Sequence, residues 1–443
     1  MYSDIIIIGA GAAGLLAAYA AASKGAEVTI VEKMPRAGRK IMITGKGRCN
    51  FTNLKNWNDF SSHIRSKVNF TRPAFYNLPP EKVIEFLENE GLETVVERGD
   101  RAYPKSMKSM DVVDTLVNAA QRKGAKLITN CEISSIGKDS ESGRFHLTAA
   151  NGPVLECKAL IIATGGLSYP GTGSTGDGYD FAKSLGHKIS PLFPSLTALV
   201  PKGYKNEGPE KDGHIHRSTP LSEMGQALCG VQLKNINLSL YINGNLAQSE
   251  FGDIDFTDGG IEGPLGFSLS RNCVKAIVNG SKTSLVLDMK PGVEEQDLFI
   301  RLKGLWSEIS KDPRSKRLNI KEMYRILLSK LMPWELVPGF RKVNPDILHG
   351  KKGNERIDLN LLAQRLKKWT FEIEGYVGYE RCVVTAGGIS TDEILPKTME
   401  SRLVPGLYLC GELVDMDADT GGYNLQLAFC TGYLAGLSAA AKI

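Results

Sequence analysis

The sequence lacks the features that identify several classes of protein. None of its apolar runs reaches the roughly 18 residues that cross a membrane, and its eight cysteines form no CxxC pair and no metal-ligand spacing. The first predicted strand begins within a few residues of Met1, which leaves no room for a signal peptide. These absences favour a cytoplasmic protein without a disulfide framework and argue against a membrane protein.

Histidine is also scarce. The chain has six, and the one close pair, His214 and His216, lies in a polar loop that offers too few further ligands for a metal ion. We therefore predict no metal site.

The overall composition is that of a soluble globular protein. The 443 residues are 42% apolar and 23% charged, and the length predicts two or three domains. Residues 311–368 hold 15 Lys and Arg against six Asp and Glu, which gives this stretch a net charge of +9. The whole chain has a net charge of +5, so the rest of the chain is negative. Such a stretch could meet an anionic substrate, a nucleic acid or a membrane surface, but no aromatic residues suited to base stacking interleave with its charges. A solvated outer face is the simpler interpretation, which favours a small-molecule substrate over a nucleic-acid partner.

The most specific motif occupies the first 32 residues. Residues 4–8 are an apolar, β-branched run typical of a strand buried on both faces. The sequence GAGAAG follows at 9–14, then a helix-prone stretch at 15–23 and a second strand at 26–31. This order predicts the first half of a dinucleotide-binding domain.

Each glycine of this turn has a physical role. Gly9 allows the tight turn, Gly11 lets the backbone approach a pyrophosphate, and Gly14 lets the helix lie close to the sheet. Ala12 and Ala13 open a helix whose N-terminus offers N–H groups and partial positive charge to phosphates. Glu32 ends the second strand, where it can accept hydrogen bonds from a ribose. A second GxGxxG at 171–176 follows its strand at a distance and leads to no acid-terminated strand, so we interpret it as a flexible loop.

A family resemblance rests on the next stretch. Residues 38–53, GRKIMITGKGRCNFTN, are rich in glycine, basic groups and amides, and they lack the spacing of a Walker A loop. Taken alone, they could also form a solvated basic loop. The stretch resembles the signature of the YhiN/BaiN-type family of bacterial NAD(P)/FAD-dependent oxidoreductases, and the N-terminal motif is similar to the glutathione-reductase-like FAD fold. The resemblance implies FAD, with Glu32 on the adenosine ribose.

The resemblance also implies further cofactor contacts. Those of the first loop, which wraps towards the pyrophosphate and flavin, are Lys33, Arg39, Lys40, Thr44, Gly45, Arg48, Cys49 and Asn50. Backbone near the adenine would come from Cys131, Glu132 and Ile133, and a close approach to the cofactor from Ala163, Thr164, Gly165 and Gly166. The last group is Gly411, Glu412, Gly421, Gly422, Tyr423, Asn424 and Leu425.

Two of these positions carry specific roles. Glu412 would bond the ribityl chain, and the helix that opens after Gly421 would point its N-terminus at the flavin N1–C2=O edge. The partial positive charge of such an N-terminus stabilises an anionic reduced flavin. The alternatives are an ordinary glycine-opened helix here and, for the Cys131 side chain, a small buried apolar residue.

The proton donor is open at this level. Tyr169, in the loop that the resemblance places beside the isoalloxazine ring, is one candidate, although a tyrosine before proline can simply pack. Residues 256–264, FTDGGIEGP, resemble the inserted-domain motif of the family, with Asp258 and Glu262 in place of its usual His and Ser. These two carboxylates are acid/base candidates, and a surface turn is the alternative.

The whole pattern predicts an α/β fold, in which a Rossmann-like, glutathione-reductase-type FAD-binding domain is split by an inserted antiparallel β domain and a small helical module. The predicted segments are 1–192 (FAD domain), 193–290 (barrel-like β domain), 291–369 (helical module), 370–384 (return strands) and 385–443 (FAD domain). A hairpin is expected at 145–149 and 154–157, with its turn at Asn151-Gly152-Pro153.

We expect an oxidoreductase that passes hydride from NADH or NADPH through FAD to an activated C=C or C=O bond of a small organic molecule, with steroid-like bile acids as one candidate from the family. The alternatives are an RNA-associated flavoprotein similar to the FAD-dependent tRNA modifiers, and an FAD-binding electron carrier without its own substrate. The sequence gives no indication of the oligomeric state.

Overall fold

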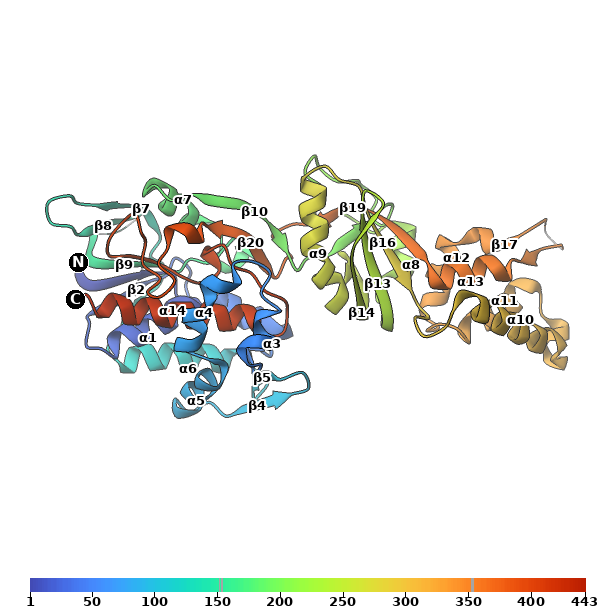
Figure 1. Cartoon of the computed structure of the whole chain (residues 1–443), viewed down its shortest axis with the longest axis horizontal. Helices are drawn as coiled ribbons and strands as arrows, with labels where there is room; N and C mark the ends of the chain where they lie inside the picture. Colours follow the sequence, from blue (N-terminus) through green and yellow to red (C-terminus); the bar gives the residue numbers. More distant parts are fainter. Residues whose placement is uncertain (151, 153, 352–353) are drawn as a thin grey trace. The chain divides into compact units, whose positions relative to one another are not determined.

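The computed structural model describes residues 1–150, 152, 154–351 and 354–443, so the turn expected at 151–153 falls largely outside the described residues. The chain forms two compact units (Figure 1). The Rossmann unit consists of Met1–Pro194 and Val383–Ile443, and the barrel unit consists of Ser195–Cys382.

The Rossmann unit is built on a seven-stranded sheet. Its strand order is β6 (Lys126–Ile128), β2 (Val28–Val31), β1 (Tyr2–Ile8), β9 (Val154–Ile162), β8 (Phe145–Ala149) and β7 (Ile133–Lys138), and β21 (Leu407–Leu409) also pairs with β9. Strands β6, β2, β1, β9 and β21 are parallel, whereas β8 is antiparallel to the first half of β9. The four isoleucines that end β1 are buried, as expected for a parallel strand with both faces covered.

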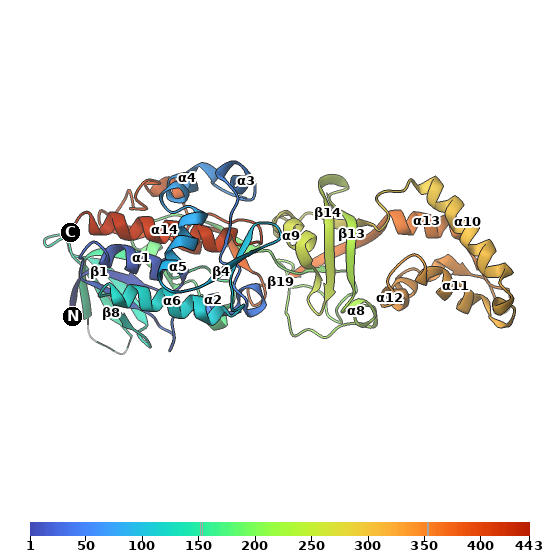
Figure 2. The same cartoon turned by 90° about the horizontal axis from the view of Figure 1, so that it is seen from below.

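Two helices from opposite ends of the chain pack side by side on this sheet: α1 (Ala12–Ala22) and α14 (Tyr423–Ala440) (Figure 2). A Cβ on Gly432 would overlap the carbonyl group of Ala13, and a Cβ on Gly436 would overlap that of Ala17. Because both contact positions advance along the chain in the same direction, the helices run parallel. The absence of side chains at these two glycines therefore sets the close approach of the helices.

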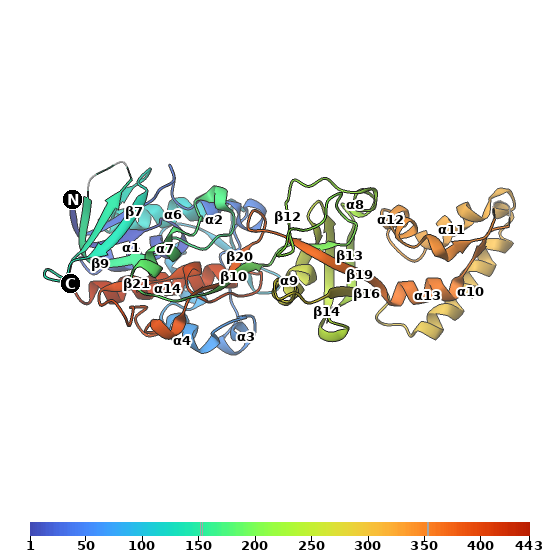
Figure 3. The same ribbon diagram turned by 90° about the horizontal axis from the view of Figure 1, so that it is seen from above.

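Shorter elements surround the sheet. They are α2 (Arg39–Ile43), η1 (Thr44–Gly47), β3 (Thr52–Asn53), α3 (Trp57–Ser61), α4 (Val68–Asn77), α5 (Pro80–Asn89), β4 (Thr94–Glu97), β5 (Arg101–Pro104), α6 (Ser109–Arg122), η2 (Pro170–Thr172), α7 (Asp177–Ser184), η5 (Thr391–Glu393) and η6 (Gly411–Leu413). Strands β10 (Ile189–Ser195) and β20 (Val384–Ile389) pair with each other (Figure 3).

The barrel unit contains a closed ring of six strands. In order they are β11 (Leu199–Pro201), β15 (Gly260–Glu262), β14 (Asn245–Thr257), β13 (Gln232–Ile242), β16 (Thr283–Asp288) and β19 (Trp369–Val377). The ring closes because β11 pairs with both β15 and β19, and all its pairings are antiparallel. The predicted antiparallel barrel is therefore confirmed.

The other elements of the barrel unit are mostly helical. They are β12 (His214–Ile215), α8 (Glu223–Leu228), α9 (Gly263–Val278), α10 (Glu295–Lys311), η3 (Pro313–Arg317), α11 (Ile320–Ser329), α12 (Leu336–Val343), η4 (Pro345–Ile347), β17 (Leu348–His349), β18 (Arg356–Ile357) and α13 (Leu359–Lys367). Helix α9 packs against β14, and α12 packs against α8 through Gly339. In the described parts of both units, no helix combines the length and the apolar character needed to cross a membrane.

Candidate functional site

The turn between β1 and α1 is tight at two glycines and open at the third. Gly9 has φ +100°, and a Cβ there would lie 2.6 Å from the Ala163 carbonyl oxygen. A Cβ on Gly14 would overlap the Gly9 carbonyl oxygen, whereas a Cβ on Gly11 would meet nothing within 4 Å. Of the three glycines in the turn, Gly11 is therefore the one whose surroundings leave room for a ligand to approach the backbone.

Helix α1 begins beside this open space without a side-chain cap and without an acidic residue in its first turn. Its first N–H groups and partial positive charge are therefore available to an anion such as a pyrophosphate.

Glu32 lies at the end of β2, next to the turn. Its carboxylate accepts hydrogen bonds from the N–H groups of Ala10 and Met34, both at 2.9 Å. The Cys131 N–H donates to the Glu32 backbone carbonyl at 2.9 Å, so the structure brings these two predicted segments together. A carboxylate has about four acceptor positions, so Glu32 keeps capacity for ribose hydroxyls.

Four buried polar atoms lie on or beside the predicted cofactor segments without a hydrogen-bond partner among the described residues. They are Nε of Arg39, Oδ1 of Asn50, Oδ1 of Asn53 and Oγ1 of Thr164. An unsatisfied buried polar group costs about 1–3 kcal/mol. Their occurrence together fits a site whose ligand completes the missing hydrogen bonds, and this donor and acceptor set fits FAD.

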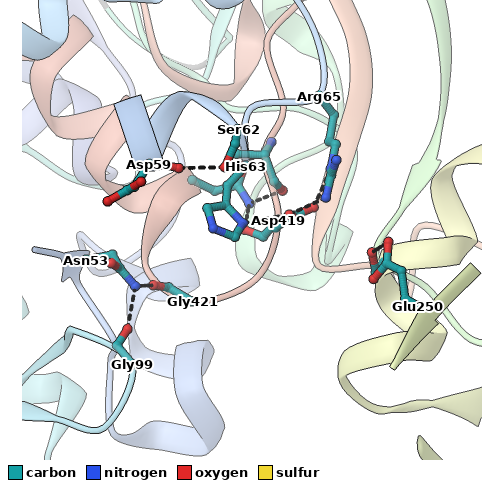
Figure 4. A network of polar contacts seen from close by, with 12 residues as sticks. Asn53, Asp59, Ser62, His63, Arg65, Gly99, Glu250, Asp419 and Gly421 are labelled. Carbon is teal, nitrogen blue, oxygen red and sulfur yellow. Dashed lines mark hydrogen bonds and ion pairs between the residues drawn. The ribbon is translucent and has the colours of Figure 1, made fainter. Parts of the chain in front are cut away.

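The tip of α14 lies beside the first loop. Gly421 and Gly422 have φ values of +117° and +95°, and Gly422 caps the helix without a side-chain hydrogen bond. Nδ2 of Asn53 donates to the carbonyl oxygens of Gly421 and Gly99, each at 3.0 Å (Figure 4). Nδ2 of Asn50 donates to the Thr52 carbonyl oxygen at 2.9 Å.

The N-termini of α1 and α14 are offset along the common direction of the two parallel helices. Gly432, which contacts Ala13 near the start of α1, lies ten residues after Gly422. With a rise of 1.5 Å per residue, the N-terminus of α14 extends roughly 15 Å beyond that of α1. Two anion-attracting helix ends at this separation suit an extended dinucleotide.

Glu412 and Lys40 form a largely buried ion pair. Lys40 Nζ lies 2.9 Å from Glu412 Oε2, while Ser168 Oγ and the Thr385 N–H donate to Oε1 at 2.6 and 2.9 Å. Burial alone raises the pKa of Glu412, but the Lys40 charge and these hydrogen bonds outweigh burial and lower it. Glu412 is therefore ionised at neutral pH, and contact with a ribityl chain stays a prediction.

Other predicted residues have protein partners. Lys33 pairs with Asp177 at 2.5 Å, and Arg48 pairs with Glu97 at 3.3 Å while lying over the Tyr103 ring. Three more of the predicted side chains are placed as follows: Thr44 donates to the Ile41 carbonyl at 2.7 Å, Cys49 is buried with its pKa raised by burial to about 12, and Tyr169 precedes η2 with φ +53°. The roles predicted for these residues stay predictions.

The sequence analysis assigned no role to a cluster at the tip of α14. Asp419 Oδ2 lies 3.0 Å from His63 Nδ1, and Arg65 Nε donates to Asp419 Oδ1 at 2.6 Å. The His63 ring stacks on Tyr423 with a centroid distance of 4.3 Å and an interplanar angle of 19°. His63 and Asp419 are 356 residues apart, so no local sequence signal could have found this pair.

A second cluster lies within the barrel unit. Arg381 donates to Asp258 at 2.6 Å and to Glu262 at 2.5 and 3.0 Å. Burial raises the pKa of Asp258, but the Arg381 guanidinium outweighs burial and lowers it. Both acid/base candidates of the inserted-domain motif are thus held in ion pairs with one arginine.

Residues 3–438 match the family model described as HI0933-like protein Rossmann domain. The chain belongs to the HI0933-like family. It is 31% identical over 446 residues to a 3-dehydro-bile acid delta(4,6)-reductase of Clostridium scindens, covering 98% of each chain. It is also 30% identical over 448 residues to a ribosomal RNA dihydrouridine synthase of Haemophilus influenzae, covering 99% of this chain and 98% of that protein.

Among solved structures, the 3-ketosteroid delta1-dehydrogenase of Sterolibacterium denitrificans superposes with a TM-score of 0.50 over the full length of both chains, at 13% identity. This likeness concerns the fold. The predicted family, the Rossmann-like fold with an inserted barrel and the assignment as an FAD-dependent oxidoreductase are confirmed.

Proposed function

We propose that this chain reduces a carbon–carbon double bond conjugated to a carbonyl group, in a small steroid-like molecule, with NADH or NADPH as the reductant in the cytoplasm. The observation that carries the proposal is near-full-length similarity to a delta(4,6)-reductase of a 3-dehydro-bile acid, and the open space at Gly11 supports it. The name of that relative describes a C=C bond conjugated to a ketone.

Different residues of this chain would bind the pyrophosphate, the ribose and the ring end of FAD. The N-terminus of α1 and Gly11 would hold the pyrophosphate, and Glu32 would hold the ribose. The tip of α14 would face the ring end, where its partial positive charge stabilises negative charge. When bound, FAD supplies hydride-transfer chemistry.

Buried residues would complete the site. The unpaired side-chain oxygen atoms of Asn50, Asn53 and Thr164 would accept hydrogen bonds from the cofactor. The Lys40–Glu412 pair would add no net charge to the site.

A visible spectrum of the purified protein is the first test. We expect a yellow protein that NADH or NADPH reduces anaerobically faster than free flavin, and that an enone such as 4-androstene-3,17-dione reoxidises. A colourless protein that cannot be loaded with FAD would refute the proposal. Reduction by the nicotinamides at the rate of free flavin would instead favour an electron carrier without its own substrate.

A second candidate is reduction of a uridine base in RNA, which is also a C=C bond conjugated to a carbonyl. The similarity to a ribosomal RNA dihydrouridine synthase favours it, as does the basic stretch 311–368. Lys316, Arg317 and Lys330 are exposed there and have no ion-pair partner among the described residues. The sequence analysis found no aromatic residue suited to base stacking in this stretch, but Trp334, with Arg325 over its ring, is 55% exposed and could stack on a base.

RNA binding separates the two candidates. Under the second candidate, a ribosomal RNA fragment binds with an affinity that falls steeply with salt, and reversing Lys316, Arg317 and Lys330 to Glu weakens binding at least 10-fold. The control reverses Lys82, Lys105 and Lys126, which are also exposed but lie in ion pairs in the Rossmann unit. Flavin turnover that ignores RNA would leave the small-molecule reductase as the function.

A further inference from the structure

We propose that His63 is the catalytic acid of the reaction, giving its Nε2 proton to the α-carbon of the substrate double bond. Asp419 and Arg65 are positioning residues that hold the imidazole ring. This inference rests on the proposed function and adds a residue that the sequence analysis did not consider.

The contacts of His63 define which ring nitrogen is available. Asp419 is a carboxylate and only accepts, so Nδ1, at 3.0 Å from Oδ2, carries a hydrogen and donates it. Nε2 has no hydrogen-bond partner within the part of the chain that the structure describes, and the side chain is 33% exposed. To give a proton from Nε2 while Nδ1 donates to Asp419, the ring must carry hydrogens on both nitrogens.

Asp419 is itself held from several sides. Arg65 Nε donates to its Oδ1 at 2.6 Å, and a second nitrogen of the same guanidinium contacts Oδ2. The Asp419 N–H donates to the His63 carbonyl at 2.9 Å, and Asn424 Nδ2 donates to the Asp419 carbonyl at 3.1 Å. A histidine whose ring is oriented by a carboxylate that is itself held in place is an arrangement that general acids use.

The stacked ring places this histidine at the cofactor end of α14. Tyr423, on which His63 stacks, is the first residue of α14 and follows Gly421 and Gly422 directly. Figure 4 shows His63 and Asp419 at the same end of the helix as the Asn53–Gly421 hydrogen bond. The proposed acid therefore lies beside the helix tip that would face the flavin ring.

The surrounding charges leave His63 as the group suited to proton transfer. Asp419 contacts His63, and Arg65 contacts Asp419. Asp59, Asp100 and Arg101 interact electrostatically with the neighbouring Tyr423. Burial raises the pKa of Tyr423 to about 12, so its phenol stays neutral in the assay range. Imidazole is the side chain among these that gains and loses a proton most readily near neutral pH.

The chemistry balances as follows. Reduction of the double bond adds a hydride to the β-carbon and a proton to the α-carbon, with a dihydronicotinamide as the source of the hydride. The Nε2–H bond of His63 breaks as the α-carbon–H bond forms, and solvent returns a proton to the imidazole. A positioned acid of this kind contributes about 10²–10⁴-fold to rate.

The test uses the FAD-loaded protein with 4-androstene-3,17-dione as the probe. His63→Phe keeps a ring to stack on Tyr423 but has no proton to give. We expect it to take up FAD and be reduced by the nicotinamide as the wild type is, while reoxidation by the probe slows about 100-fold or more. The matched control is His146→Phe, which removes another histidine paired with a carboxylate, Glu156, at the surface.

Chemical rescue by imidazole and the pH dependence of the reoxidation rate distinguish a catalytic role of His63 from a structural one. In His63→Ala, added imidazole should restore part of the reoxidation rate, in proportion to the imidazolium present. The wild-type reoxidation rate should fall at alkaline pH, and His63→Phe should lack that fall. A structural role would give neither result.

Nitrogen NMR of protein labelled at histidine gives a readout that needs no turnover. We expect saturating probe to shift the His63 Nε2 resonance of the oxidised, FAD-loaded protein. If wild type turns over and His63→Phe reoxidises at the wild-type rate, the role of His63 is refuted while the proposed function stands. If no enone reoxidises the wild type, the proposed function fails, and an unmoved Nε2 resonance then refutes this inference as well.

Discussion

Gly432 of α14 lies directly against the backbone of Ala13 in α1, so closely that a Cβ on Gly432 would overlap the Ala13 carbonyl group. Replacing it with valine must push the two helices apart. We expect Gly432→Val to lower the free energy of unfolding by about 1–3 kcal/mol and, since both helix tips are proposed to hold the cofactor, to weaken FAD binding. Thermal unfolding and FAD titration measure the two effects.

The control for this variant is Gly304→Ala. Gly304 lies exposed within α10, and a Cβ there meets nothing within 4 Å. Alanine should raise helix stability by about 0.5–1 kcal/mol. A Gly432→Val protein that melts like the wild type would contradict the proposed helix contact.

Gly11 and Gly14 should separate ligand binding from folding. Gly11→Ala places a methyl group in open space, so the apo protein should keep its stability while the affinity for FAD falls at least 10-fold. Gly14→Ala should instead destabilise the apo protein, because its Cβ overlaps the Gly9 carbonyl oxygen. Equal FAD affinity of Gly11→Ala and the wild type would count against the proposed phosphate position.

Removing Lys40 should reverse the way in which the Glu412 contribution to the free energy of unfolding changes with pH. In the wild type the lowered pKa of Glu412 adds stability above the ordinary glutamate value of about 4.3, and this contribution is lost as pH falls through the lower folded value. In Lys40→Met, burial dominates and the pKa rises, so stability is lost as pH increases through the raised value. We expect a deficit of about 3 kcal/mol at pH 7.5 and a smaller one at pH 4.5.

Unfolding curves at the two pH values check this prediction. Lys82→Met is the control, since Lys82 and Glu85 form a pair in which both side chains are more than half exposed, and such pairs contribute about 0–1 kcal/mol. A Lys40→Met deficit that grows in acid would show that Glu412 is not the group responsible.

Arg381 should matter to the barrel through Glu262 more than through Asp258. Glu262 is 11% exposed and Asp258 is 55% exposed. Arg381→Met leaves the Glu262 charge buried and unpaired, which should cost about 3 kcal/mol, and the double variant with Glu262→Met should recover most of that loss. Asp258→Asn should cost less than 1 kcal/mol. Urea unfolding of the four proteins checks the order, and a double variant no better than Arg381→Met would contradict it.

The sequence predicted the Rossmann elements well because their signals are local. The apolar run of β1, the glycine turn and the acid after β2 stand in chain order, and the structure places them as expected. Strand β14 was not predicted, because seven of its 13 residues are polar and its alternation of polar and buried apolar residues is confined to 253–257. Helix α9 was also missed, since it begins with Gly263 and Pro264, which indicate a turn.

The candidate site divides in the same way. The partners of Glu32 follow from its own turn, whereas the pairing of Lys40 with Glu412 depends on how strands distant in the chain align. The pairing of Arg381 with Glu262 also joins residues far apart in sequence. Such contacts have no periodicity or spacing, so only the assembled fold reveals them.

The interruption of the Rossmann unit by the barrel has a consequence for synthesis. Strand β21 and helix α14 are translated after the whole barrel, yet β21 pairs with β9 and α14 packs against α1. A nascent chain halted before Leu407 therefore holds every strand of the barrel but only one of the two helix tips that would grip FAD. If both helix tips hold the cofactor as proposed, stable loading of FAD would follow translation of α14, the last helix of the chain.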